Sequence, residues 1–287
     1  MNPETQALAP GLYLVATPIG AARDITLRAL DILAGAEVIA AEDTRSLRRL
    51  MELHGIAPGQ RPMIAYHDHN GPRARPRLLA ALEAGKSVVY AAEAGTPMVA
   101  DPGFDLVRAA VAGGHAVVSA PGPSAAITAL TLSGLPTDRF LFAGFLPAAA
   151  SRRKTALSEL AAVPATLIFF ESPRRVAVML RDAAAVLGGN RRAALCRELT
   201  KKFEEVLRGT LDDLAAQCAK RTLKGEIVVL VDRPDSSSVN DSDIEARLSE
   251  ALATRSVRDA ADRVSADLGL PRRRVYQLAL KLADDQG

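Results

Sequence analysis

Short apolar runs alternate with helical patterns along the first half of the chain. Runs with the length and composition of strands occupy residues 11–16, 36–41, 63–66, 87–92 and 116–120. Each precedes a segment with helical spacing of apolar residues. The first such helix is expected to begin near Asp24 and to place Ile25, Leu27, Leu30 and Leu33 on one face. Five repeats with short connections predict a mainly parallel α/β sheet.

The regular alternation of strands and helices ends at residues 140–145. From there on, predicted strands outnumber predicted helices. Further strands are predicted at 165–170, 192–201, 204–208 and 224–231, and helices at 176–187 and 211–220. We interpret residues 1–146 and 147–233 as two α/β domains, the second with a mixed sheet. A polar linker spans 234–243 and is followed by helices at 244–253, 257–268 and 271–283, which form a C-terminal helical domain, 244–287.

The helical tail has a glycine turn before a helix that opens with three arginines. This pattern is typical of a helix-turn-helix, and an ordinary helical tail with a solvated basic face is the alternative. The formal net charge of +3 and the pI near 9.0 are compatible with nucleic-acid binding without requiring it.

Composition limits the remaining classes of protein. The hydrophobic fraction of 48% with only 4% aromatics predicts cores built from Ala, Leu and Val. Cys196 and Cys218 lie in apolar patterns, so neither a disulfide framework nor a zinc cluster is expected. No apolar run approaches the roughly 20 residues of a membrane span, and the N-terminal residues lack the form of a signal peptide. We expect a soluble, cytoplasmic protein without membrane association.

Turn-forming and polar residues follow the predicted strands. The richest stretch, residues 93–103, contains Gly95, Pro97, Pro102 and Gly103, which cannot continue a strand. Ligands of open α/β sheets bind at the carboxyl ends of the strands, so the repeated coincidence predicts a site there. A purely structural crossover loop is the alternative for each stretch alone.

Several familiar motifs fail on inspection. Gly85-Lys-Ser87 imitates the end of a phosphate-binding loop, but Ala80 stands in place of the first glycine. The pair of histidines in His67-Asp-His69 favours a hydrogen-bonding cluster over a metal site. No serine lies in a nucleophile elbow. We therefore expect neither a metal ion nor hydrolytic chemistry.

Taken together and in order, the strand-end sequences resemble those of one family. They are Thr17-Pro-Ile-Gly20 with Asp24-Ile-Thr-Leu-Arg28, Ala41-Glu-Asp-Thr-Arg45, Tyr66-His-Asp-His-Asn70, Ala94-Gly-Thr-Pro97 with Asp101-Pro-Gly103, Pro121-Gly-Pro123, Glu171-Ser-Pro173, Arg197-Glu-Leu-Thr-Lys201 and Lys224-Gly-Glu226. This set resembles the bacterial small-subunit ribosomal RNA methyltransferase I family of the tetrapyrrole methylase superfamily. The resemblance implies two α/β domains with an S-adenosylmethionine cleft between them, and a homodimer. It also implies 2′-O-methylation of a cytidine in the decoding region of 16S rRNA.

The resemblance also implies roles for particular residues. The expected cofactor contacts are Pro18, Gly95, Thr96, Pro97, Val99, Ser124, Ala125, Glu171, Leu199 and Gly225. The candidates for positioning or activating the acceptor are Glu42, Asp43, Arg45, Glu93 and Lys201. For each of these, an ordinary salt bridge is the alternative. Ala21, Glu93 and Ala100 depart from the family's usual Asn, Asp and Ser.

The basic residues of the tail are the expected RNA contacts. Arg272, Arg273, Arg274 and Lys281 would face phosphate. Two other functions remain open at this point. A tetrapyrrole C-methyltransferase would share the fold but would not need the basic tail. A non-enzymatic RNA-binding protein would leave the polar strand ends without a purpose.

Overall fold

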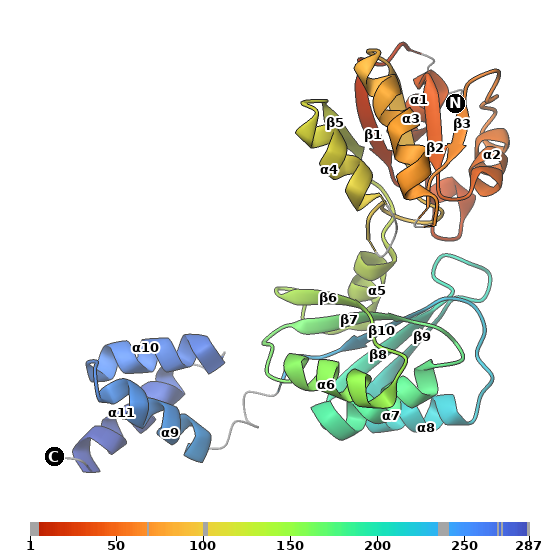
Figure 1. The fold of residues 1–287 in the computed structure, drawn as a ribbon. Helices are drawn as coiled ribbons and strands as arrows, with labels where there is room; N and C mark the ends of the chain where they lie inside the picture. The colour runs from red at the N-terminus through yellow and green to blue at the C-terminus, as the bar shows by residue number, and fades with distance from the viewer. Residues whose placement is uncertain are drawn as a thin grey trace. The chain divides into compact units, whose positions relative to one another are not determined.

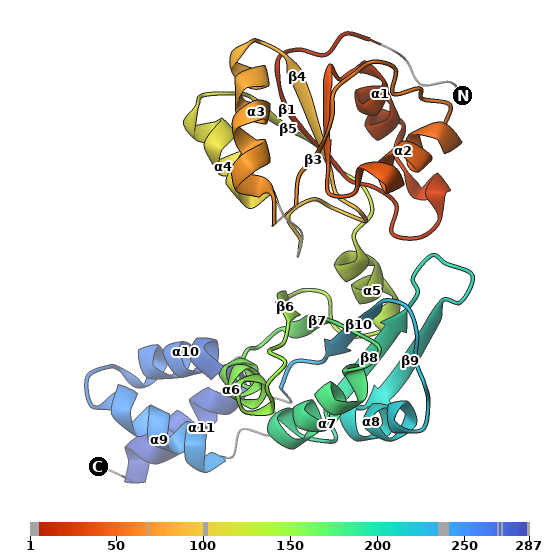
Figure 2. The same cartoon turned by 45° about the vertical axis from the view of Figure 1, so that its right-hand side comes forward.

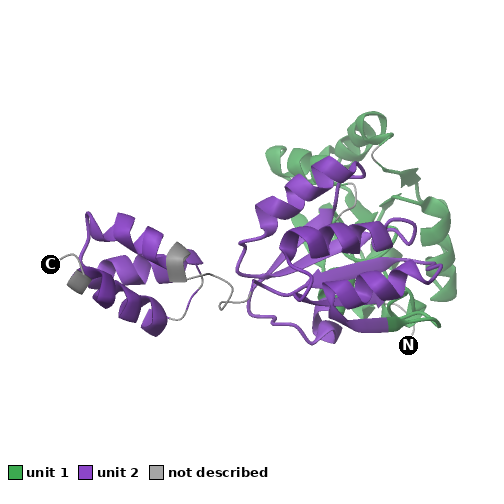
Figure 3. Cartoon of the chain, turned by 90° about the horizontal axis from the view of Figure 1, so that it is seen from below, with its two compact units in different colours: residues 1–129, 197–205 green, residues 130–196, 206–287 purple. Residues whose placement is uncertain are grey.

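The computed structural model describes residues 6–67, 69–99, 103–234, 241–268, 270 and 272–285. They form two compact units, one comprising residues 1–129 with 197–205 and the other 130–196 with 206–287 (Figure 3). These units differ from the predicted boundary at residue 146 in two respects. The second unit begins earlier, and a short segment from the middle of the second half belongs to the first unit.

The first unit is built on a five-stranded parallel sheet, as predicted (Figure 1). Its strands are β1 (Gly11–Val15), β2 (Val38–Ala41), β3 (Met63–Ala65), β4 (Ser87–Ala91) and β5 (Val117–Ala120), in the order β3-β2-β4-β1-β5. The helices between these strands are η1 (Ala22–Asp24), α1 (Leu27–Gly35), α2 (Thr44–Leu53), α3 (Gly71–Glu83) and α4 (Phe104–Ala112). Helix α5 (Ala125–Ser133) follows β5 and continues from the first unit into the second.

Helices cover both faces of this sheet (Figure 2). Tyr13 and Val15 of β1 belong to the core that includes residues of α1 and α2. Their neighbours Leu12 and Leu14 belong to the core that includes α3 and α4. Successive side chains of a strand point to opposite faces, so a strand buried on both faces becomes a continuous apolar run.

The start of α1 corrects one prediction. Asp24 lies in the 3-10 helix η1, and the cap of α1 is Thr26, whose hydroxyl oxygen accepts a hydrogen bond from Ala29 N at 3.1 Å. Leu27 is 57% exposed, so it does not share the buried face with Leu30 and Leu33. The short extra turn shifts the register of the helix relative to the sequence pattern.

The second unit contains a mixed sheet, as predicted. Its strands are β6 (Phe140–Phe145), β7 (Thr166–Glu171), β8 (Arg192–Arg197), β9 (Glu205–Thr210) and β10 (Ile227–Val231), in the order β6-β7-β10-β8-β9. Strand β7 pairs parallel with β6 and antiparallel with β10. Since β6 is hydrogen-bonded to β7, a boundary at residue 146 would remove it from its own sheet.

One face of this sheet is covered by three helices. They are α6 (Ala150–Leu160), α7 (Val176–Leu187) and α8 (Leu211–Ala219). Leu157, Met179 and Leu214, one from each helix, are buried against Leu167 and Phe169 of β7 in a single core. The bounds of α7 are those predicted from the sequence. Cys196 and Cys218 are buried and lie outside any disulfide.

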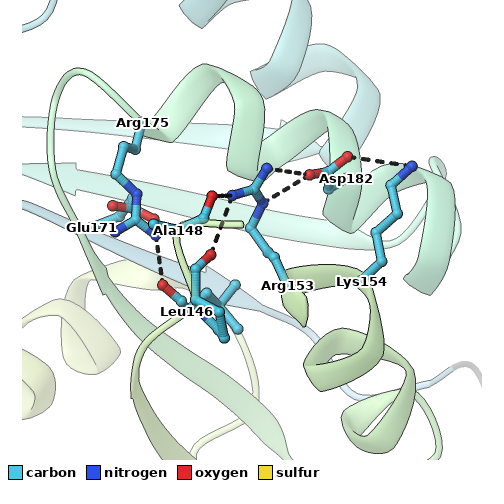
Figure 4. A network of polar contacts seen from close by, with 8 residues as sticks. Leu146, Ala148, Arg153, Lys154, Glu171, Arg175 and Asp182 are labelled. Atoms are coloured by element: carbon cyan, nitrogen blue, oxygen red, sulfur yellow. Dashed lines mark hydrogen bonds and ion pairs between the residues drawn. The ribbon is translucent and has the colours of Figure 1, made fainter. Parts of the chain in front are cut away.

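A charged network links α6 to α7 and to the loop after β6 (Figure 4). Arg153 is only 4% exposed, and its Nε and Nη2 lie 2.7 and 2.6 Å from Asp182 Oδ2. Its Nη1 donates to the carbonyls of Pro147 and Ala148, at 3.2 and 2.8 Å. A buried guanidinium with a carboxylate and two carbonyls is well satisfied, and it fixes the loop after β6 to α7.

The tail forms the three predicted helices, α9 (Asp241–Leu252), α10 (Val257–Leu268) and α11 (Arg272–Asp285). Ile244, Leu248, Val264 and Val275 form its own small core. Residues 235–240 of the predicted linker, and Gly269 and Pro271 of the predicted turn, lie outside the described residues. Among the helices that the structure describes, none has the length and apolarity needed to cross a bilayer.

Candidate functional site

The carboxyl ends of the first unit's strands meet at one edge of the sheet. All the strand pairs in this sheet are parallel, so the loops that leave β1, β2, β4 and β5 emerge on the same side. These loops carry most of the residues that the sequence singled out. The geometry therefore collects residues from positions 17 to 125 at one edge, where ligands of open α/β sheets bind.

Three of the loops are hydrogen-bonded to one another. Thr17 and Gly95 exchange backbone hydrogen bonds of 2.9 and 3.0 Å, and Thr17 Oγ1 donates to Ala92 O at 3.2 Å. Thr96 Oγ1 donates to Pro123 O at 3.0 Å. The loops that follow the neighbouring strands β4, β1 and β5 are thus neighbours as well. The hydrogen bonds between them hold this part of the edge in one shape.

The backbone of the β4 loop adopts unusual conformations. Gly95 has a φ of 81°, and Met98 has a φ of 68°, a left-handed conformation that costs a residue with a side chain of order 1–3 kcal/mol. Such strain is concentrated at functional sites, so it supports a binding role for this loop. Met98 was not among the predicted site residues, because a methionine gives no sequence signal for a left-handed backbone.

The segment 197–205 reaches this edge from a distant part of the sequence. Ala21 N donates to Thr200 Oγ1 at 3.0 Å. A Cβ atom on Gly20 would lie 2.5 Å from Thr200 Oγ1 and 2.8 Å from Leu199 O, so only glycine allows this approach. The side chain of Ala21 can form no hydrogen bond. Its backbone N–H stabilises the turn instead, through the hydrogen bond to Thr200 Oγ1. The structure thereby brings the predicted residues Leu199 and Lys201 into the first unit.

Most of the predicted cofactor residues belong to this edge. Those of the first unit are Pro18, Gly95, Thr96, Pro97, Val99, Ser124, Ala125 and Leu199. Glu171 and Gly225 belong to the second unit. For every residue in both sets, contact with a cofactor stays a prediction. Ala100, which departs from the family pattern, and Asp101 lie outside the described residues.

Glu171 ends β7 and is almost fully buried, at 3% exposure. Its Oε1 accepts a hydrogen bond from Ser172 N at 2.7 Å. Its Oε2 lies 3.2 Å from Nη2 of Arg175, which is drawn beside it in Figure 4. The same Arg175 nitrogen donates to Leu146 O at 2.5 Å. In the described structure the carboxylate is thus engaged by its own unit. Gly225 has a φ of 89°, a turn conformation that favours glycine.

Four of the five acceptor candidates lie where β2 and β4 end, and Lys201 lies in the segment 197–205. Asp43 caps α2: its Oδ1 accepts from Arg45 N at 2.8 Å, and its Oδ2 lies 3.2 Å from Arg45 Nη2. The hydrogen bond from the Arg45 guanidinium lowers the pKa of Asp43. Glu42 Oε2 accepts a hydrogen bond from Glu93 N at 3.4 Å, which joins the neighbouring strand ends. Lys201 Nζ pairs with Glu198 Oε1 at 2.9 Å.

The loop that follows β3 contains the two histidines of the sequence motif, His67 and His69. Within the described residues no three His, Cys, Asp or Glu side chains converge on a metal-sized site. The loop is shaped instead by Asn70, whose Oδ1 accepts from His67 N at 2.8 Å and whose Nδ2 donates to Ala65 O at 2.9 Å. Asp68 lies outside the described residues.

The basic residues of the tail lie at the start and the middle of α11. Arg272 Nε donates to Asp262 Oδ1 of α10, and this hydrogen bond lowers the pKa of Asp262. Arg273 and Lys281 are exposed, and Arg274 is half-buried. The opposite side of the helix, with Val275 and Ala279, is fully buried in the tail's core.

Comparisons with known proteins agree with this organisation. The family model described as Tetrapyrrole (Corrin/Porphyrin) Methylases matches residues 11–215, and that described as RsmI C-terminal HTH domain matches residues 238–283. The chain is 50% identical to the Ribosomal RNA small subunit methyltransferase I of Mesorhizobium japonicum, over 98% of this chain and 95% of the relative. The protein of that name from Halalkalibacterium halodurans is 41% identical over 93% of both chains.

The chain belongs to the ribosomal RNA small subunit methyltransferase I family. It is therefore a methyltransferase of the tetrapyrrole methylase superfamily, and the predicted fold class is confirmed.

Solved structures show the same fold. The methyltransferase CobJ has a TM-score of 0.60 at 18% identity, covering 78% of this chain and 94% of that one. The uroporphyrin-III C-methyl transferase from Thermus thermophilus, complexed with S-adenyl homocysteine, has a TM-score of 0.53 at 22% identity, covering 77% and 96%.

Proposed function

We propose that this protein transfers a methyl group to the ribose 2′-hydroxyl of a cytidine in the decoding region of 16S rRNA, within the small ribosomal subunit. S-adenosylmethionine is the methyl donor. The observation that carries the proposal is the 50% identity over 98% of the chain, which includes both the α/β units and the helical tail. We also propose that the enzyme acts in the cytoplasm as a homodimer.

The first unit's edge fits the methyl donor. Its loops offer small residues, and Gly95 adopts its left-handed φ without the strain that a side chain would bring. Pro18, Thr96, Pro97, Val99, Ser124 and Ala125 would hold the donor, largely by backbone contacts, with Glu171, Leu199 and Gly225 as the other contacts. Rigid loops favour methyl transfer because an in-line displacement depends on near-attack geometry.

The charged residues beside this edge would handle the acceptor. Because Arg45 lowers the pKa of Asp43, this carboxylate stays ionised at neutral pH and is a weak proton acceptor. Its role is to orient Arg45, whose side chain is 91% exposed and can stabilise negative charge on the acceptor oxygen or a neighbouring phosphate. Glu42, Glu93 and Lys201 are the further candidates at this edge.

The tail would hold the RNA through phosphate contacts. Arg273 and Lys281 are exposed and can reach phosphate directly. Arg272 is paired with Asp262, so its contact with phosphate would compete with an existing hydrogen bond. Arg274 is the fourth predicted contact.

A methyl-transfer assay with three acceptors tests the proposal. Radiolabelled S-adenosylmethionine is offered with small ribosomal subunits lacking the modification, naked 16S rRNA, or uroporphyrinogen. We expect label in RNA at a cytidine ribose, and donor binding in calorimetry on protein treated with a chelator. Label in uroporphyrinogen alone would establish the tetrapyrrole alternative, and binding without transfer to any acceptor would contradict the enzymatic role. Sedimentation measures the proposed dimer separately.

A further inference from the structure

Phe203 is an exposed aromatic residue that the proposed chemistry does not use. It lies in the segment 197–205, and it is 64% exposed. The ammonium nitrogen of the preceding Lys202 lies 5.6 Å from the centre of its ring. Single exposed apolar residues are common on protein surfaces, so the case for a role of Phe203 rests on the loop that carries it.

The segment that carries Phe203 is held by a strained and well-bonded backbone. Glu198 and Thr200 have φ values of 51° and 62°, left-handed conformations that cost a residue other than glycine of order 1–3 kcal/mol each. Hydrogen bonds offset this cost: Thr200 N donates to Glu204 Oε2 at 2.6 Å, and Arg197 Nε donates to Glu205 Oε2 at 3.1 Å. Phe203 is therefore displayed by a preorganised loop.

The position of the loop connects the ring to the candidate site. Leu199 is buried at 6% exposure, and Thr200 accepts the hydrogen bond from Ala21, next to the loop that ends β1. The close approach at Gly20 fixes the same segment. The loop thus anchors itself beside the site through Leu199 and Thr200, while it leaves Phe203 in solvent.

An exposed ring beside a cation is well suited to contact single-stranded nucleic acid. Unpaired bases stack on aromatic side chains, and lysine neutralises the backbone phosphate. We propose that Phe203 stacks on an unpaired rRNA base next to the methylated nucleotide, with Lys202 facing phosphate. This inference rests on the proposed rRNA methylation and names one of its substrate contacts.

The test compares Phe203→Ala and Phe203→Trp with wild type. The matched control is Val111→Ala, which truncates a 60% exposed apolar residue at the far end of α4. For each protein, the KM for small subunits, the dissociation constant for S-adenosylmethionine and the melting temperature are measured. We expect Phe203→Ala to raise the KM about 5- to 150-fold, the range for losing one stacked base, with unchanged donor binding and melting temperature. Phe203→Trp should keep the KM near the wild-type value.

Other outcomes separate the two proposals. If the wild-type protein does not methylate rRNA, the proposed function falls and the stacking contact with it. If wild type is active and Phe203→Ala has an unchanged KM, only the stacking inference is wrong. Reduced donor affinity and melting temperature would assign Phe203 a structural role, and a change in sedimentation without a change in KM would assign it to an interface between copies.

Discussion

The two units use the same kinds of charged residue in opposite ways. In the second unit Arg153 and Asp182 are buried together, at 5% and 14% side-chain exposure. At the edge of the first unit, Arg45 is 91% exposed while it pairs with Asp43. Burial makes the first pair part of the folded core, because removing Arg153 would leave the largely buried Asp182 with only the more distant Lys154 as its cationic partner. Exposure leaves the second pair weak in stability and accessible to a ligand.

The largest effect is expected from breaking the buried pair. Arg153→Ala should destabilise the protein by about 3–5 kcal/mol, because the largely buried Asp182 would keep only Lys154, whose Nζ lies 3.7 Å from its Oδ1, and two carbonyls would lose their donor. Chemical denaturation measures the change. The neighbouring Arg152→Ala is the control, since this side chain is exposed and should change stability by less than about 0.5 kcal/mol. Equal effects of the two substitutions would show that the buried network is not stabilising.

A smaller effect is expected where the distant segment approaches the edge. Gly20→Ala places a Cβ against Thr200 Oγ1 and Leu199 O, so the segment must shift at a cost of about 1–3 kcal/mol. The melting temperature and the affinity for S-adenosylmethionine should both fall. Gly71→Ala is the matched control, because its Cβ would meet Tyr66 at an ordinary 3.6 Å. If Gly20→Ala binds S-adenosylmethionine with unaltered affinity, the segment 197–205 does not contribute to donor binding.

Asp43 of the exposed pair has two roles that can be separated: it caps α2, and its charge pairs with Arg45. Asp43→Ala removes both and should cost about 1 kcal/mol of stability, whereas Asp43→Asn keeps a good N-cap and should preserve stability. If Asp43 orients Arg45 toward the acceptor, both variants lose methyl transfer while they retain donor binding. Loss of transfer in Asp43→Ala alone would assign the residue to the helix cap.

Acid should affect this pair in a defined direction. The hydrogen bond from Arg45 lowers the pKa of Asp43 below its ordinary value of 3.8. Its stabilising contribution is therefore complete above that value and is lost as the pH falls through the lower folded-state pKa. Acid unfolding of Asp43→Asn should lack this contribution. An identical acid transition in the two proteins would show that the pair contributes nothing to stability.

The smallest effect is expected in the tail. Arg273→Ala should reduce the magnitude of the logarithmic salt slope of RNA binding by about 0.7–0.9, the value for one phosphate contact. Arg272→Ala should reduce it less, because Asp262 already occupies that guanidinium. Asp262→Asn should remove the competition and strengthen RNA binding. A filter-binding salt titration compares the three variants, and unchanged slopes would restrict these arginines to a solvated face.

Local patterns determined much of what this chain is. The bounds of α7, the five strand and helix repeats, the mixed second sheet and the three tail helices all follow from periodicity and turn residues. These signals act over a few residues, because apolar spacing decides which face of an element is buried. The ordered loop sequences also indicated the family. The roles of the individual acceptor and RNA contacts remain predictions.

Tertiary structure alone decided where the distant parts meet. The sequence pattern does not reveal that β1 lies between β4 and β5, that β6 joins the second sheet, or that residues 197–205 lie beside Gly20. Likewise, Arg152, Arg153 and Lys154 form one basic run in the sequence, yet only Arg153 is buried. The reason is physical: these outcomes depend on contacts between residues far apart in the chain, and those contacts exist only after the sheets have assembled.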